Sequence, residues 1–89
     1  MKHVSIRVSG VVQGVFFRAS AKEKADQLGI QGKVRNEHDG SVAIIAEGDD
    51  IAIEEFIQWC REGPRLSRVD KCVVKEEAVQ NMKGFLIER

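Results

Sequence analysis

The apolar residues near the start of the chain follow two different periods. Residues 2–9 carry an apolar side chain at every second position: Val4, Ile6 and Val8. This two-residue period predicts a half-buried strand over Lys2–Ser9. From Phe17 the apolar positions fall at helical spacing, which predicts a helix that ends at Leu28, because Gly29 favours a helix C-terminus.

Alternation returns in the middle of the chain and predicts a hairpin. Ile30–Glu37 forms one strand, and Ser41–Glu47, rich in valine, isoleucine and alanine, forms its partner. The residues between them, His38-Asp39-Gly40, make a turn of the kind that joins antiparallel strands. We expect Gly48-Asp49-Asp50 to end the second of these strands and to supply a side-chain oxygen that caps the next helix.

The rest of the chain predicts one more helix and two strands. An apolar stripe over Ile51–Arg61 predicts the helix, which Gly63-Pro64 ends. Val69–Lys75 is the next strand, and after a polar loop Phe85–Ile87 is a short last strand. This order of elements predicts an α+β ferredoxin-like fold (split βαβ, βαββαβ), an antiparallel sheet with two helices packed on one face. Right-handed crossovers place the first and third strands in the middle of that sheet.

Length and charge narrow the function classes. The chain has 89 residues and a mass of 10.0 kDa, so residues 1–89 are expected to form a single domain. Lys and Arg number 14 and Asp and Glu number 14, so the basic excess of a nucleic-acid binder is missing. No apolar run is long enough for a membrane span or a signal peptide, and no apolar stripe is left over for a second subunit. We therefore expect a cytoplasmic monomer that binds neither nucleic acid nor membrane.

Neither cysteine belongs to a recognisable metal or redox motif. Cys60 and Cys72 show no CxxC spacing, and in a chain without an export signal they are expected to be reduced, buried thiols. His3 and His38 lie far from both in the sequence, so a zinc site would have to form by the fold alone. We expect no metal and no cofactor.

The segment before the first helix carries the strongest functional signal. Gly10 and Gly14 bracket a bend where backbone N–H groups can turn inward and the first helical N–H groups have no partner. Such a bend is a concave seat for an anion. Arg18 stands where the helix dipole disfavours a cation, and an anion held between them resolves this conflict. The alternative is that the glycines only shape a turn and that Arg18 is a solvated surface charge.

A second candidate lies at the end of the strand that follows the helix. Asn36 faces the helix side of the sheet if Val34 does, and from there it would reach toward the bend. Its amide both donates and accepts, which suits a group that holds a water in line with an electrophile. The alternative is an asparagine that only forms the tight turn after it.

Two stretches of the chain resemble the signatures of the acylphosphatase family. Residues 10–18, GVVQGVFFR, match every specified position of the first signature, G-x-V-Q-G-V-x-[FY]-R. Gly32–Asn36, followed by Gly40 and Val42, resembles the second. The resemblance extends over the whole chain, including Gly63-Pro64, Val69 and Gly84-Phe85-Leu86-Ile87. Lys33 replaces the usual aromatic residue, a change expected to alter packing or charge near the site, whereas Ser67 in place of alanine is expected to have no consequence.

This resemblance implies an enzyme that hydrolyses the carboxyl–phosphate bond of acyl phosphates to a carboxylate and inorganic phosphate, without a metal. It implies that Arg18 is the catalytic, phosphate-binding arginine and that Asn36 orients the attacking water. Inorganic phosphate would be both product and competitive inhibitor. The loop backbone would cradle the phosphoryl oxygens, so the implied substrate-binding residues are Gln13, Gly14, Val15, Phe16, Phe17 and Arg18.

The chemistry of an acyl phosphate fits these residue types. Its carboxylate leaves readily, so catalysis mainly requires positioning and the stabilisation of charge on the phosphoryl oxygens. One rival hypothesis is a non-catalytic phosphate- or RNA-binding module of the same fold, and another is a sensor or part of a larger maturation protein. The chain has five aromatic residues: Phe16, Phe17, Phe56, Trp59 and Phe85. Three of them fall on helices or helix starts, and this distribution favours core packing over base stacking.

Overall fold

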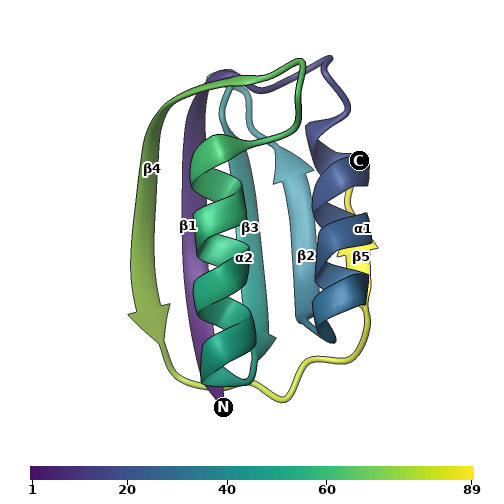
Figure 1. Cartoon of the computed structure of the whole chain (residues 1–89), viewed down its shortest axis with the longest axis vertical. Helices are drawn as coiled ribbons and strands as arrows, with labels where there is room; N and C mark the ends of the chain where they lie inside the picture. The colour runs from purple at the N-terminus through teal and green to yellow at the C-terminus, as the bar shows by residue number, and fades with distance from the viewer.

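The computed structural model describes residues 1–89 and consists of a sheet with both helices on one face (Figure 1). The elements follow the predicted order: β1 Lys2–Val11, α1 Phe17–Leu28, β2 Gln31–Asn36, β3 Val42–Gly48, α2 Asp50–Glu62, β4 Arg68–Glu77 and β5 Phe85–Ile87. The sheet has five strands in the order β4-β1-β3-β2-β5. The ferredoxin-like α+β fold is therefore confirmed, and so is the central position of the first and third strands.

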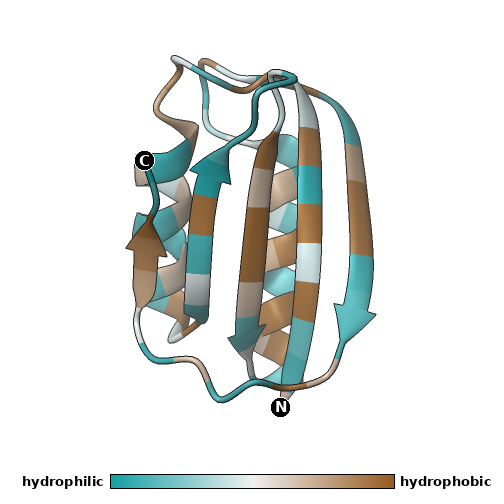
Figure 2. Cartoon of the chain, turned by 180° about the vertical axis from the view of Figure 1, so that it is seen from behind, coloured by the Kyte–Doolittle hydropathy of each residue, from teal (hydrophilic) through white to brown (hydrophobic).

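The sequence predicted an antiparallel sheet, and this prediction is wrong at one edge, where the sheet has a parallel pair. The first four strands pair antiparallel, but β5 pairs parallel with β2. The reason is the path of residues 78–84. They leave the end of β4 and run along the lower end of the sheet, past the ends of the central strands, so that β5 enters the far edge in the direction of β2 (Figure 2).

The core lies between the sheet and the helices. One cluster of 17 buried apolar residues contains the alternating side chains of β1 and four residues of α2: Val4, Ile6, Val8, Ile53, Phe56, Ile57 and Cys60. The ring centroids of Phe17 and Trp59 lie 5.4 Å apart within this layer. A buried phenylalanine of this kind stabilises a fold by about 3–5 kcal/mol relative to alanine. Because Phe17 is the first residue of α1, its packing fixes the start of the helix from which Arg18 projects.

No helix of this chain combines the length and the apolar content that a membrane crossing requires.

The sequence predicted how α1 ends and how α2 begins, and only the first of these two predictions is confirmed. Gly29 ends α1 as predicted, with a φ of 70° and an N–H group directed at two carbonyls of the last turn. The predicted side-chain cap of α2 is wrong, because the side chain of Asp49, its N-cap residue, accepts no capping hydrogen bond. The backbone carbonyl of Asp49 instead accepts from the N–H of Ile53 at 2.9 Å. Both Asp49 and Asp50 are exposed, so water can satisfy the remaining N–H groups at this end.

Gly10 does not form the bend to which the sequence analysis assigned it. β1 continues to Val11, and Gly10 lies inside the strand at a bulge, with a φ of 130°. A Cβ at this position would overlap the backbone carbonyl oxygen of Arg68, so glycine is required for the close approach of β1 to β4. Of the two glycines, only Gly14 shapes the bend.

Both cysteines are free, as expected, but only Cys60 is buried, whereas Cys72 on β4 is half-buried. Burial raises the pKa of the Cys60 thiol well above its ordinary value, and burial also raises the pKa of Cys72. Both thiols are therefore protonated at neutral pH and are poor nucleophiles.

A buried acid ties residues 78–84 to the open face of the sheet. Glu47 on β3 is 1% exposed and accepts hydrogen bonds from the backbone N–H groups of Gln80 (2.6 Å) and Met82 (2.7 Å). His3 on β1 is fully buried, and its Nδ1 lies 2.8 Å from Oε2 of Glu47. The hydrogen bond from Gln80, together with those from His3 and Met82, lowers the pKa of Glu47 despite its burial.

We expect Glu47→Gln to lower the melting temperature by roughly 5–10 °C, because one amide oxygen replaces two carboxylate oxygens that accept buried hydrogen bonds. In the wild type this stabilisation is complete above the ordinary glutamate pKa of about 4.3 and is lost as the pH falls through the lower pKa of the folded protein. Thermal melts between about pH 3 and pH 7 measure both effects. Glu23→Gln, which alters an exposed carboxylate of α1, is the control, and an equal loss in both variants would contradict the assignment.

Candidate functional site

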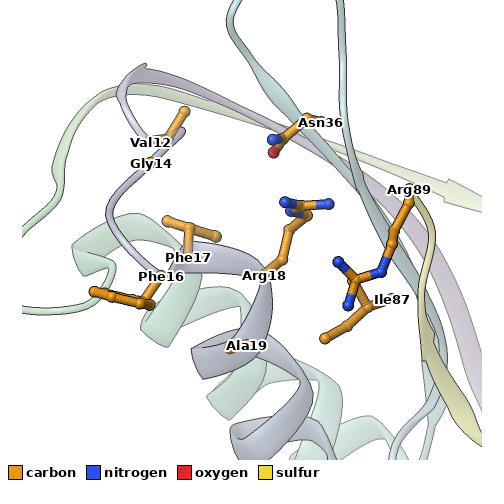
Figure 3. A pocket seen from close by; sticks show the side chains of 9 residues that line it. All are labelled: Val12, Gly14, Phe16, Phe17, Arg18, Ala19, Asn36, Ile87 and Arg89. Carbon is orange, nitrogen blue, oxygen red and sulfur yellow. The ribbon is translucent and has the colours of Figure 1, made fainter.

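A hollow of about 470 Å³ opens where four segments of the chain meet (Figure 3). These segments are the loop before α1, the start of α1, the end of β2 and the last residues of the chain. The lining residues are Val12, Gly14, Phe16, Phe17, Arg18, Ala19, Asn36, Ile87 and Arg89. The fold thus brings Arg18 and Asn36, the two candidates singled out from the sequence, into the same hollow.

The loop bends around this hollow through two residues in the left-handed conformation. Gly14 has a φ of 74° and Phe16 a φ of 63°. Glycine adopts this conformation freely, whereas it costs a phenylalanine roughly 1–3 kcal/mol. No side chain caps the N-terminus of α1 and no acidic residue lies in its first turn. The first N–H groups of the helix and its positive dipole end are therefore available to an anion.

Two of the six expected substrate-binding residues do not line the hollow with their side chains. The side-chain amide of Gln13 donates to the backbone carbonyls of Glu37 and Ser41, both at 2.8 Å, and so ties the loop to the β2–β3 hairpin. Val15 is half-buried and packs against the core. Both residues shape the loop, and the other four line the hollow: Gly14, Phe16, Phe17 and Arg18.

Arg18 is held in place by the last segment of the chain. Its Nη1 donates to the carbonyl oxygen of Glu88 at 3.2 Å, and the N–H of Glu88 donates to the carbonyl of Val34 on β2 at 2.8 Å. The guanidinium points toward Asn36 (Figure 3) and forms no ion pair with an acidic side chain. Its remaining N–H groups are free to hold two oxygens of an anion.

Asn36, the last residue of β2, presents an unsatisfied acceptor. Its Oδ1 is buried and has no hydrogen-bond partner. Buried polar atoms without a partner are rare in proteins, and each requires an explanation such as a missing water or a functional role. Val34 is fully buried in the core, so Asn36 lies on the helix side of the sheet, as the alternation predicted. This oxygen is suited to accept a hydrogen bond from a water in the hollow.

The carboxyl-terminal segment contributes two lining residues that the sequence analysis missed, Ile87 and Arg89. β5 brings them to the site by pairing Ile87 with Val34 of β2. Arg89 adds a second guanidinium, which forms no ion pair with an acidic side chain. No local pattern signals this contribution, because it depends on the parallel pairing of a three-residue strand with a distant partner.

Lys33, which stands where the resembled signature has an aromatic residue, lies outside the hollow. Its Nζ is 3.7 Å from Oε2 of Glu88, the residue whose carbonyl holds Arg18. Both side chains of this pair are more than a third exposed, so the ion pair contributes at most about 1 kcal/mol. Lys33 therefore gives modest support to the segment that positions Arg18.

The hollow favours anions. Two guanidinium groups and the positive end of α1 face it, and none of its lining residues is acidic. No group of three or more His, Cys, Asp and Glu side chains in the molecule is arranged to hold a metal ion. The arrangement is that of a site for a small, highly charged anion such as a phosphoryl group.

Comparisons with known proteins show the family of the chain. The family model described as Acylphosphatase matches residues 4–87. The acylphosphatase of Methylococcus capsulatus is 51% identical over 79 residues, which make up 89% of this chain and 86% of that protein. The crystal structure of acylphosphatase from Bacillus subtilis superimposes with a TM-score of 0.96 at 34% identity and covers 100% of both chains.

A similar fold also occurs inside a longer protein. HypF from T. kodakarensis matches 100% of this chain with 12% of its own, at 33% identity and a TM-score of 0.86. The family match, in contrast, runs through nearly all of the present sequence, and the relatives named Acylphosphatase align over most of their own length. With both signatures inside the matched region and the same fold in the solved relative, the chain belongs to the acylphosphatase family.

Proposed function

We propose that the hollow is the active site of this acylphosphatase and that Arg18 and Asn36 are its catalytic residues. Family membership makes the chain a hydrolase of acid anhydrides that acts on small acyl phosphates. One observation carries the assignment of the site: a guanidinium without an acidic partner faces a buried amide oxygen without a donor. A bound phosphoryl group together with an attacking water satisfies both groups at once.

The phosphoryl group binds between the loop and Arg18. Backbone N–H groups of Gln13–Phe17 and of the first turn of α1 donate to its oxygens, and Arg18 holds two of them with its planar fork. Arg89 adds positive charge at the rim. In a loose transition state the charge spreads over the three equatorial oxygens, so these fixed donors stabilise it without reorganising. The same donors bind inorganic phosphate, which is therefore a competitive inhibitor as well as the product.

Asn36 positions the attacking water. Its Oδ1 accepts a hydrogen bond from the water and so directs a lone pair of the water oxygen at phosphorus. As the new oxygen–phosphorus bond forms, the bond between phosphorus and the acyl oxygen breaks, and its electron pair leaves with the carboxylate. The proton of the water passes to a phosphoryl oxygen of the substrate. This route needs no histidine, cysteine or carboxylate, and none lines the hollow.

The wider setting of the enzyme forms part of the proposal. Residues 1–89 act as one acylphosphatase domain, and the protein is a cytoplasmic monomer that binds no nucleic acid. The open face of the sheet supports the last point, because the residues that line its central hollow include no aromatic ring on which a base would stack. The formal net charge of zero supports it as well.

Purified protein is expected to hydrolyse benzoyl phosphate at the same rate with and without EDTA, because guanidinium and amide groups supply the positive charge of the site. The assay follows the loss of benzoyl phosphate at neutral pH. Binding of inorganic phosphate without hydrolysis would instead identify a non-catalytic phosphate-binding module. A rate that collapses in the chelator and returns with added metal would contradict metal-independent catalysis.

A further inference from the structure

A second hollow, of about 490 Å³, lies on the other side of Phe16. Its lining residues are Val15, Phe16, Ser20, Pro64, Arg65 and Leu66. Phe16 also lines the first hollow, so the two hollows share one wall. Phe16 and Leu66 are 73% and 64% exposed, which places two large apolar side chains in water beside a site for an anion. Exposed apolar surface next to a reactive site is typical of a surface that binds a ligand.

The two walls of this second hollow are held in fixed positions. Phe16 adopts the left-handed conformation at a cost in free energy, and its exposed ring stands between the two hollows. On the other wall, the backbone N–H and the hydroxyl of Ser67 both donate to the carbonyl of Pro64, at 2.9 and 2.6 Å. These bonds close a turn that carries Leu66. Ser67 therefore has a structural role, contrary to the expectation that it has no consequence.

Buried packing fixes the walls relative to each other. A Cβ on Gly63 would come within 3.1 Å of the ring of Phe17, so the turn that begins at Pro64 rests directly against the residue that follows Phe16. Phe17 is itself anchored in the core by Trp59. A groove with prepositioned walls loses little conformational entropy when a ligand enters it.

The geometry of phosphoryl transfer gives the direction of the acyl group. The attacking and leaving oxygens lie on opposite sides of phosphorus. Asn36 would hold the water on one side, and Figure 3 shows Phe16 on the side away from Asn36, with the start of α1 between them. The leaving carboxylate therefore carries its acyl group over Phe16 and into the second hollow.

We infer that the second hollow is the binding site for the acyl group of the substrate, and that it selects apolar acyl groups, aryl or branched alkyl. Phe16 and Leu66 determine this specificity, since their exposed side chains form its apolar walls. The inference rests on the proposed function. It also assigns a task to position 16, which the first signature leaves unspecified.

The test compares two substrates that share the acyl phosphate bond, acetyl phosphate with a methyl group and benzoyl phosphate with a phenyl ring. In Phe16→Ala, which also alters a residue of the phosphate-binding loop, we expect kcat/KM for benzoyl phosphate to fall about tenfold further than kcat/KM for acetyl phosphate. Leu66→Ala leaves the loop before α1 intact and is expected to lower only the benzoyl value, by about threefold. Leu86→Ala removes an exposed leucine of β5 outside both hollows and is expected to change neither value.

Inhibition by inorganic phosphate distinguishes a lost acyl contact from a disturbed loop, and its constant is expected to equal the wild-type value in Leu66→Ala and Leu86→Ala, whose side chains lie outside the first hollow. An equal loss on both substrates, or an unchanged preference in both Phe16→Ala and Leu66→Ala, overturns the inference and leaves the proposed function intact. A wild-type protein that hydrolyses neither substrate overturns the proposed function, and the inference fails with it.

Discussion

Arg18→Ala is expected to lower turnover of benzoyl phosphate by about a thousandfold or more and to weaken inhibition by inorganic phosphate in parallel. Both effects have one cause in the proposed site, where the same guanidinium binds the phosphoryl oxygens of the substrate and those of the product. Steady-state kinetics with inorganic phosphate as inhibitor measure both quantities in a single experiment.

Two further variants sharpen this result. Arg18→Lys keeps the charge but not the planar fork, so its activity is expected to lie well below that of the wild type. Arg61→Ala removes an exposed arginine of α2 that lines neither hollow, and it is expected to have wild-type kinetics. Undiminished phosphate affinity in Arg18→Ala would show that Arg18 does not bind the phosphoryl group.

Asn36→Ala is expected to lower turnover by about tenfold to a thousandfold while the inhibition constant of inorganic phosphate stays the same. The reason is the proposed role of Asn36, which is to orient the water and not to hold the phosphoryl group. A large rise in that constant would make Asn36 a phosphate ligand instead. Gln58→Ala, which truncates an exposed amide on α2, is the matched control.

Thermal stability gives a second measure of the role of Asn36. No protein group donates to its Oδ1, so the alanine variant loses no hydrogen bond within the protein at this atom and is expected to melt at or above the wild-type temperature. A strongly lowered melting temperature would instead support the alternative hypothesis from the sequence, in which Asn36 only stabilises the turn between β2 and β3.

The fold was predictable wherever a local rule decides the structure. α1 begins at Phe17 and ends at Leu28, as predicted, because apolar spacing and a left-handed glycine are both local signals. The direction of β5 depends on a long crossing connection, and no local signal records it. The predicted side-chain cap at Asp49 was wrong for a related reason. At an exposed helix end, water competes with the side chain for the free N–H groups, and the sequence does not show which of them binds.

The site shows the same division. Arg18 and Asn36 followed from a loop pattern and from strand alternation, both of which are encoded within a few residues. Arg89 and the second wall formed by Leu66 come from segments that only the tertiary fold brings to the loop. The sequence placed Gln13 correctly in the loop. Its side chain, however, binds the β2–β3 hairpin, and this long-range contact could not be predicted from the sequence.

Because the Glu88 carbonyl binds Arg18, the two ends of the chain differ in how well they would tolerate an attached group. Figure 1 places the carboxyl terminus beside the start of α1 and the amino terminus at the opposite end of the molecule. A purification tag or fluorophore joined after Arg89 would crowd the proposed active site and disturb the Glu88 peptide that binds Arg18. Attachment ahead of Met1 leaves the proposed active site unobstructed, so immobilisation on a sensor chip should be made there.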